Sequence, residues 1–125
     1  SPHFKNSVGV RAIWSDCHVP REFFPKMKAK LMASVHELPI WAMGSLNTKE
    51  KFAAARLHMA EDVWAKMKGT DSRECRNCHT IEAMDLSAQD AGAAKKHNRE
   101  RMLARGETCI DCHKGIGHGL PPGYE

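Results

Sequence analysis

Long hydrophobic runs are missing from this chain of 125 residues. No apolar stretch approaches the roughly 18 residues that a membrane-spanning helix needs, and the chain does not open on the charged, apolar and small-residue pattern of a signal peptide. The segment is therefore expected to be soluble. Its first residue is Ser1 and not an initiator methionine, which suggests a processed or trimmed N-terminus and is compatible with a lost membrane anchor.

Several other signatures are missing as well. The alternating, β-branched pattern of strands is nearly absent, which predicts a mainly α-helical fold with much irregular loop. Phosphate loops, Ser/His/Asp arrangements and paired carboxylates are not evident, which argues against bond chemistry on a substrate and favours electron transfer. The net charge is +4, but Lys and Arg are spread among Glu and Asp, so no nucleic-acid partner is expected.

Three stretches carry helical patterns between residues that start or stop helices. The predicted helices are 20–38 between Pro20 and Pro39, 51–68 between the Asn47–Glu50 capping box and Gly69, and 88–105 between the Ser87–Asp90 pair and Gly106. By length, residues 1–125 form a single domain, and so small a domain buries only a modest apolar core. Something other than apolar side chains is expected to help hold it together.

Four of the five cysteines form two CxxCH motifs, at Cys75–His79 and Cys109–His113. Two thiols three positions apart can add to the two vinyl groups of one haem, and the following His places an imidazole on the iron. The motifs therefore predict two c-type haems. Their predicted thioether links are Cys75, Cys78, Cys109 and Cys112, and their predicted proximal ligands are His79 and His113.

Two other kinds of site use paired cysteines. A four-cysteine zinc site is the main alternative, but the gap between the two pairs is longer than the usual zinc-ribbon gap, and zinc gives no reason for a His directly after each pair. A thioredoxin-like redox pair would need a βαβ context, which the sequence lacks. A haem protein is red with a Soret band, whereas a zinc protein is colourless.

An incomplete motif precedes these two, and in chain order the three are called the first, second and third motifs. Cys17 is also followed by a histidine, His18, but the position of the first motif cysteine holds Trp14. From the residues alone this stretch is either a third haem site with one thioether missing or a coincidence.

Five further histidines offer second axial ligands, which a low-spin electron carrier needs. They are His3, His36, His58, His97 and His118. His97 and His118 flank the last motif, while the methionines that could compete sit at helical core spacing. The count of spare histidines favours bis-histidine over His/Met ligation.

The chain resembles the NapC/NirT family of periplasmic cytochromes, which includes the NrfH and CymA types. The resemblance rests on GVRA through SDCHVP, then VWAKMKGTDSRECRNCHTIEAMD, AAKKH and TCIDCHKGIGHGLP, and covers nearly the whole chain. Members of this family carry four c-type haems and one N-terminal transmembrane anchor, oxidise membrane quinol and pass electrons to periplasmic reductases. The anchor and the first family haem motif are not among the 125 residues, so we do not expect this segment alone to oxidise quinol.

The resemblance implies roles for individual residues. Proximal ligands would be His18, His79 and His113, and distal ligands would be His3, His97 and His118. Three of each kind balance at three bis-histidine haems, which leaves His36 and His58 as ordinary helix residues. Two haems would be doubly linked, and the third would be held by one thioether through Cys17, with the Trp14 indole against the unlinked vinyl edge. Asp16 aligns with a family aspartate near the quinol pocket, where it would accept a quinol proton or order water, or else serve only as a turn former.

The predicted function is therefore periplasmic electron transfer between membrane quinol, reached directly or through a partner, and a periplasmic reductase or other redox protein. Haem faces are expected to replace much of the apolar core, so the haem-free chain is expected to be largely unfolded. The alternatives are a subunit of a quinol dehydrogenase complex, in which the catalytic chemistry takes place at the quinol site, and a multihaem site that binds a small ligand at an open axial position. Covalent haem attachment predicts a periplasmic location, at or tethered to the inner membrane in a full-length protein.

Overall fold

The computed structural model describes residues 3 and 11–124, and this part of the chain is built of helices and loops without a β-strand. In chain order the elements are α1 (Trp14–His18), α2 (Phe23–Ala42), α3 (Lys49–Gly69), α4 (Arg73–Arg76), the 3-10 turns η1 (Ile81–Ala83) and η2 (Leu86–Ala88), α5 (Ala91–Lys96), α6 (Arg99–Arg105) and α7 (Cys109–Cys112). The predicted mainly α class is confirmed. None of the helices described is long and apolar enough to cross a membrane.

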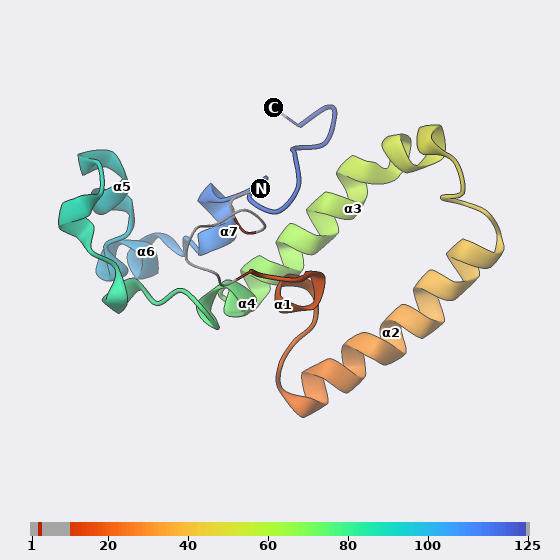
Figure 1. Cartoon of the computed structure of the whole chain (residues 1–125), viewed down its shortest axis with the longest axis horizontal. Coiled ribbons are helices and arrows are strands. Elements are labelled where there is room, and N and C mark those ends of the chain that lie inside the picture. Colours follow the sequence, from red (N-terminus) through yellow and green to blue (C-terminus); the bar gives the residue numbers. More distant parts are fainter. Residues whose placement is uncertain (1–2, 4–10, 125) are drawn as a thin grey trace.

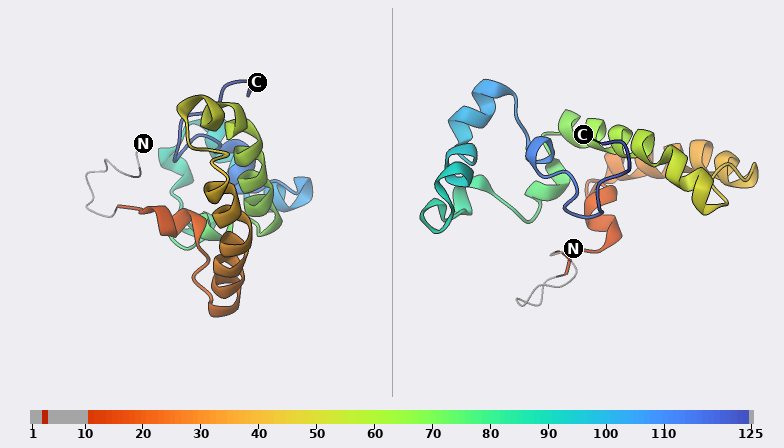
Figure 2. Two further views of the ribbon diagram at one scale, coloured as in Figure 1. Left: turned by 90° about the vertical axis from the view of Figure 1, so that its right-hand side faces the viewer. Right: turned by 90° about the horizontal axis from the view of Figure 1, so that it is seen from above.

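The long helices and the short ones occupy different parts of the molecule. α2 and α3 form an open hairpin at one end, while α5 and α6 lie at the other end (Figure 1 and Figure 2). Between these ends lie the three short helices that carry the cysteines, with α7 against α3 and α1 against α4. The cysteine motifs therefore lie together in the middle of the molecule, although they are far apart in sequence.

The first predicted helix continues past its expected end. α2 contains Pro39 and runs on to Ala42, so the prediction that Pro39 stops the helix is wrong. A proline lacks only its own N–H, and the Pro39 carbonyl still accepts the amide of Met43 at 2.9 Å. The chain turns away at Gly44, whose φ of 66° suits a residue without a Cβ.

The second predicted helix begins at Lys49, two residues before the expected start at 51, and its N-cap lies one residue after the predicted one. Thr48, and not Asn47, is the N-cap of α3, because its extended backbone lets Oγ1 accept the Lys51 amide at 3.3 Å. The Asn47 side chain accepts instead from Lys51 Nζ at 3.1 Å. The predicted end at Gly69 is confirmed.

The third predicted helix is two helices. Asp90 caps α5 by accepting the Ala93 amide at 2.9 Å, and Asn98 caps α6 by accepting the Arg101 amide at 2.9 Å. Asn98 has an extended backbone, so the chain breaks at the residue after α5's C-cap, His97. The prediction of one continuous helix over 88–105 is wrong, because Asn is a strong N-cap as well as a tolerated helix residue. The predicted end at Gly106 is confirmed, with φ at 59°.

The C-terminal tail lies along α3. The Trp64 and Tyr124 rings meet at 5.1 Å between centroids, and Lys114 Nζ stands 5.0 Å from the Trp64 ring. Arg56 donates to the carbonyl of Gly119. As predicted from its Gly and Pro content, this tail has no regular structure, yet these contacts hold it in place.

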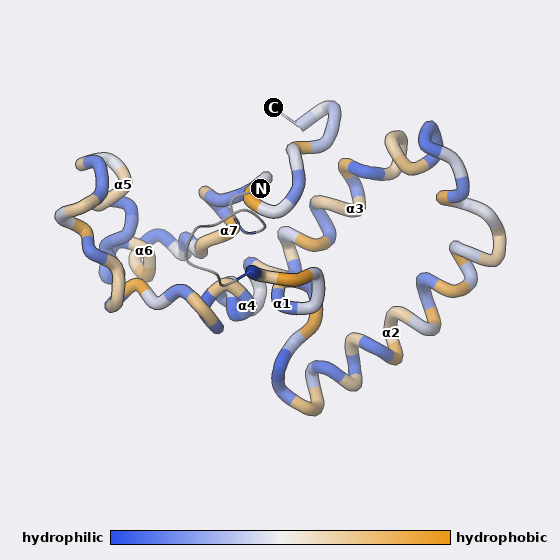
Figure 3. The backbone as a smooth tube through the Cα atoms, in the orientation of Figure 1, coloured by the Kyte–Doolittle hydropathy of each residue, from blue (hydrophilic) through white to orange (hydrophobic). Residues whose placement is uncertain are grey.

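Few apolar side chains are buried. The buried hydrophobic residues of the described chain are Ile81, Met102 and Ile110. Hydrophobic and hydrophilic residues alternate along both long helices (Figure 3), and α2 leaves Phe24 82% and Trp41 80% exposed. The protein part alone therefore forms only a small core.

Candidate haem site

Each cysteine motif is folded into a single helical turn. The amide of His79 donates to the Cys75 carbonyl at 2.9 Å, and the amide of His113 donates to the Cys109 carbonyl at 2.9 Å. Residues four apart on such a turn lie on the same face. Each turn thus presents a thiol and an imidazole on one side.

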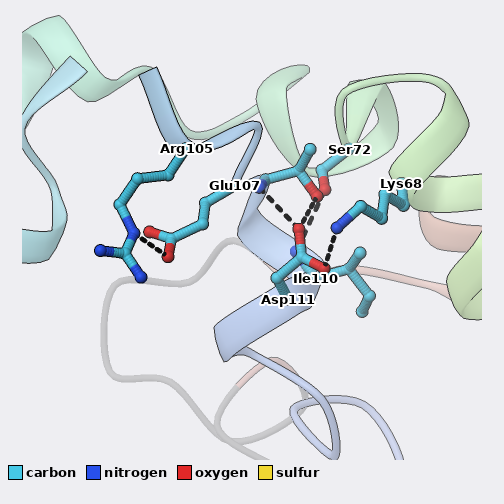
Figure 4. Close-up of polar contacts among 7 residues, drawn as sticks. Lys68, Ser72, Arg105, Glu107, Ile110 and Asp111 are labelled. Atoms are coloured by element: carbon cyan, nitrogen blue, oxygen red, sulfur yellow. Dashed lines mark hydrogen bonds and ion pairs between the residues drawn. The ribbon is translucent and has the colours of Figure 1, made fainter. Parts of the chain in front are cut away.

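The second and third motifs are joined through one buried serine (Figure 4). Ser72 is 0% exposed, immediately precedes α4, and its Oγ accepts the amide of Ile110 in α7 at 3.1 Å. Beside it, Lys68 Nζ donates to Asp111 Oδ1 at 2.8 Å, and Asp111 in turn accepts the Thr108 amide at 2.8 Å. These bonds fix α7 against the end of α3 and the start of α4.

Removing the buried hydroxyl should destabilise this junction. We expect Ser72→Ala to lower the free energy of unfolding of the haem-loaded protein by about 1–3 kcal/mol, because the buried Ile110 amide loses its acceptor. Denaturant titration followed by circular dichroism measures this. The matched control is Ser34→Ala, whose exposed hydroxyl bonds only to Lys30 in its own helix, with an effect within about 0.5 kcal/mol. Equal effects of the two substitutions would contradict the assigned role.

The histidines singled out from the sequence lie in three pairs. Ring centroids are 6.1 Å apart for His3 and His79, 6.0 Å for His18 and His118, and 5.9 Å for His97 and His113. Every pair joins a motif histidine to a histidine outside the motifs. The histidine that follows the last motif is therefore paired with the first, incomplete motif and not with its own.

These separations suit one metal between two rings. A first-row metal holds an imidazole nitrogen at about 2 Å, and the ring centre lies about 1 Å further, so two axial imidazoles have centres about 6 Å apart. The ring planes make angles of 88° in the pair of His79, 44° in the pair of His18 and 10° in the pair of His113. The distances fit a bis-histidine arrangement at all three sites.

A pocket of about 370 Å³ surrounds the third pair. Both His97 and His113 line it, as do the two cysteines of the motif, Cys109 and Cys112, and the buried Met102. A covalently linked haem needs such a cavity with thiols at its edge and imidazoles on both faces. The residues present at this site fit the group that the motif predicts.

The incomplete motif lies in α1. The Trp14 ring stacks on the His18 ring at 5.4 Å, with 19° between the planes. Asp16 Oδ2 accepts the amide of Ile13 at 2.9 Å, and Asp16 Oδ1 lies 3.6 Å from Arg21. Asp16 thus stabilises the start of α1, and it also lines a pocket of about 340 Å³ with Arg21, Lys26 and Lys30.

Burial shifts the pKa of two cysteines and of two histidines in the motifs. It raises the pKa of the Cys75 thiol to about 11, helped by neighbouring Cys109 and Cys17, and it also raises the pKa of Cys17. Burial lowers the pKa of His18, aided by His118, and lowers the pKa of His113, aided by His97 and His79. Neutral imidazoles bind metal, whereas protonated thiols do not suit a zinc site or a redox nucleophile.

The competing zinc arrangement does not form. Over residues 3 and 11–124, no three or more His, Cys, Asp or Glu side chains gather in a way that could hold a metal ion. All five cysteines lie in this range, and none of them forms a disulfide. The geometry gives no support to a four-cysteine zinc site.

Two histidines lie outside the three pairs, and two further polar residues contact the site. His36 is exposed on α2, and His58 lies 3.6 Å from Asp62 on α3. No motif in the sequence indicates the role of the buried Ser72, or of Gln89, the chain's one glutamine, which contacts His97. The GVRA stretch that precedes α1 begins outside the described residues, at positions 9 and 10.

Known proteins resemble this chain over nearly its whole length. The NapC/NirT cytochrome c family, N-terminal region, matches residues 1–123. Cytochrome c-type protein NapC of Escherichia coli (strain K12) is 53% identical over 121 residues, which are 97% of this chain and 59% of that protein. NapC of Paracoccus pantotrophus is 49% identical over 122 residues, 95% of this chain and 49% of that protein. Cytochrome c-type protein TorY of Escherichia coli O157:H7 is 46% identical over 120 residues, 96% of this chain and 32% of that protein.

The chain thus spans about three fifths of the length of the Escherichia coli NapC protein that it matches. No solved structure matches it.

Proposed function

Because this chain belongs to the NapC/NirT cytochrome c family, we propose that it is a periplasmic electron-transfer cytochrome with three haems c. It relays electrons from membrane quinol, directly or through a partner, to a periplasmic reductase or other redox protein. The observation that carries this proposal is the set of three histidine pairs, each about the width of a metal with two axial imidazoles. Covalent haem attachment takes place on the periplasmic side, where we also place the protein's partners.

Each haem would be held by one motif and one distant histidine. The proposed axial pairs are His79 with His3, His18 with His118, and His113 with His97. The haem iron supplies one-electron exchange, and two protein ligands on each iron favour a low-spin carrier over a site that binds an external ligand. The thioether links would come from both cysteines of the second and third motifs and from Cys17 alone in the first.

The proposed haems would also complete the core. The buried hydrophobic side chains of the described residues are too few for a stable domain of this length, and the third pair already borders a pocket of about 370 Å³. Haem faces would cover the apolar surface that the helices leave open. A chain of this kind gains its stability from the cofactor.

The three motifs lie close enough to form one relay. α1, which carries the first motif, packs against α4, and Cys17 and Cys109 both contribute to the raised pKa of Cys75. Haems attached at these positions would therefore be neighbours, as stepwise electron transfer requires. Absorption during reductive titration tests the function: the haems should be low-spin and exchange electrons with an electrode, and a chain without haem or with inert haems would refute it.

A second candidate, quinol oxidation at this chain itself, is favoured by the pocket beside α1. Asp16, Arg21, Lys26 and Lys30 line it. A carboxylate there could take a quinol proton, and Arg21 lies 3.6 Å from it. We propose this role only for a longer protein that also carries a membrane anchor, because this chain covers 59% of the length of its Escherichia coli NapC relative.

One substitution distinguishes the number of haems from the number of thioether links that hold the first haem. We expect an intact mass with three haems, and a pyridine haemochrome band displaced from that of purely doubly linked haem, because Trp14 cannot form a thioether. Trp14→Cys should leave the mass count at three while moving the band toward the doubly linked position. Trp14→Phe is the control and should leave the band unchanged. Two haems per chain, or a haemochrome band whose position is the same in Trp14→Cys as in the unmodified protein, would contradict the proposed single link.

A further inference from the structure

One polar contact reaches directly into the third histidine pair. Nδ1 of His97 and Oε1 of Gln89 lie 2.6 Å apart, and both side chains are partly buried. The amide oxygen is an acceptor only, so Nδ1 must carry the proton and donate it to Gln89. The lone pair of the ring is then on Nε2, the nitrogen that remains for a metal.

The fold places these two residues together by its turn structure. Gln89 follows the 3-10 turn η2, which Asp85 holds by accepting the amides of Ser87 and Ala88. α5 then returns the chain, and His97 stands at its C-terminal end, where the helix packs against η2. The Gln89 oxygen is thus held against Nδ1 of the His97 ring, which leaves Nε2 without this contact.

We propose that Gln89 is a positioning residue for the third haem: by accepting the Nδ1 proton of His97, it fixes the ring's tautomer and orientation so that Nε2 faces the iron opposite His113. This inference rests on the proposed function. The ring pair at 5.9 Å and the pocket that both histidines line give the ring its target. Histidines that bind a metal commonly donate their other nitrogen to such a partner, which fixes the tautomer.

A neutral acceptor also sets how strongly the ring donates to iron. An amide oxygen polarises the imidazole less than a carboxylate does, so His97 keeps the character of a neutral ligand. Removing the acceptor leaves the ring free to turn and to exchange tautomers, and its bond to iron becomes easier to displace. Replacing the amide with a carboxylate keeps the acceptor and makes the ring a stronger donor.

The test uses the haem-loaded full chain and carbon monoxide, which binds reduced iron when a distal histidine leaves. Gln89→Leu keeps the size of the side chain and removes the acceptor, and we expect its affinity for carbon monoxide to rise by about 10-fold to 100-fold, at one molecule per chain. Gln89→Glu should bind carbon monoxide no more tightly than the unmodified protein, and one haem should show a lower reduction potential.

The control is Asn98→Ala, which removes the N-cap of α6 next to His97 but leaves the Gln89 contact in place. It should bind carbon monoxide like the unmodified protein. The inference is overturned if Gln89→Leu behaves like the unmodified protein, if Gln89→Glu behaves like Gln89→Leu, or if Asn98→Ala matches Gln89→Leu. Failure of the proposed function looks different, because the unmodified protein would then lack low-spin haem altogether.

Discussion

Without its haems, the chain should lose its cooperative tertiary structure and much of its helix. The reason is the small protein core: Ile81, Met102 and Ile110 are its buried hydrophobic residues among those described. The long helices α2 and α3 contain no buried residue, and most of the stability of a helix in a protein comes from tertiary packing of one of its faces. They therefore depend on surfaces that the protein alone does not provide.

The measurement compares the haem-loaded protein with chain produced where haem attachment is blocked. Far-ultraviolet circular dichroism of the haem-free chain should show about half of the helical signal of the haem-loaded protein or less, and heating should give no sharp transition. The haem-loaded protein should melt cooperatively. A compact haem-free chain with a sharp melting transition would contradict the idea that haem faces complete the core.

Local signals in the sequence predicted most helix ends well. Gly69 and Gly106 stand where helices were expected to stop, because glycine is a poor helix former and adopts left-handed backbone readily. Errors arose where one residue type supports two outcomes. The sequence predicts that the helix stops at Pro39, but a proline lacks only its own N–H, and its carbonyl still accepts a helical hydrogen bond. The sequence also predicts that Asn98 lies within a helix, whereas Asn98 caps the start of α6.

Local chemistry also located half of each site. A CxxCH motif places its own cysteines and histidine on one turn, so the motif histidines could be assigned from five consecutive residues. Their partners could not be paired in the same way, because pairing depends on which distant segments meet. His18 and His118 are brought together by the tail that packs along α3, through Trp64 and Tyr124. No spacing rule connects positions so far apart.

Residues that support the site were invisible for a related reason. Ser72 has an ordinary hydroxyl, and only its backbone, with φ at 49°, and the approach of α7 make it the acceptor for Ile110. Gln89 likewise matters because a turn and a short helix bring His97 back to it. Such roles follow from tertiary packing, which a single sequence does not state.

Cys17→Ala should cost the protein one whole haem, whereas Cys112→Ala should cost none. The first motif has a single thiol, since Trp14 occupies the other position, so its proposed haem has one covalent link to lose. Cys112 shares its haem with Cys109, and both line the same pocket, so one link remains when the other is removed. The two substitutions change the protein mass equally and differ only in the link they remove.

Mass spectrometry under denaturing conditions reads this difference directly, because only covalently attached haem survives. Cys17→Ala should show two haems per chain, and Cys112→Ala should show three, with its pyridine haemochrome band displaced further from the doubly linked position. His18 and His118 would still face each other at 6.0 Å in Cys17→Ala, so the native protein can retain the unlinked haem through its axial ligands. A Cys17→Ala variant with the same number of covalent haems as the unmodified protein would show that Cys17 carries no link, and the first site would then be either non-covalent or absent.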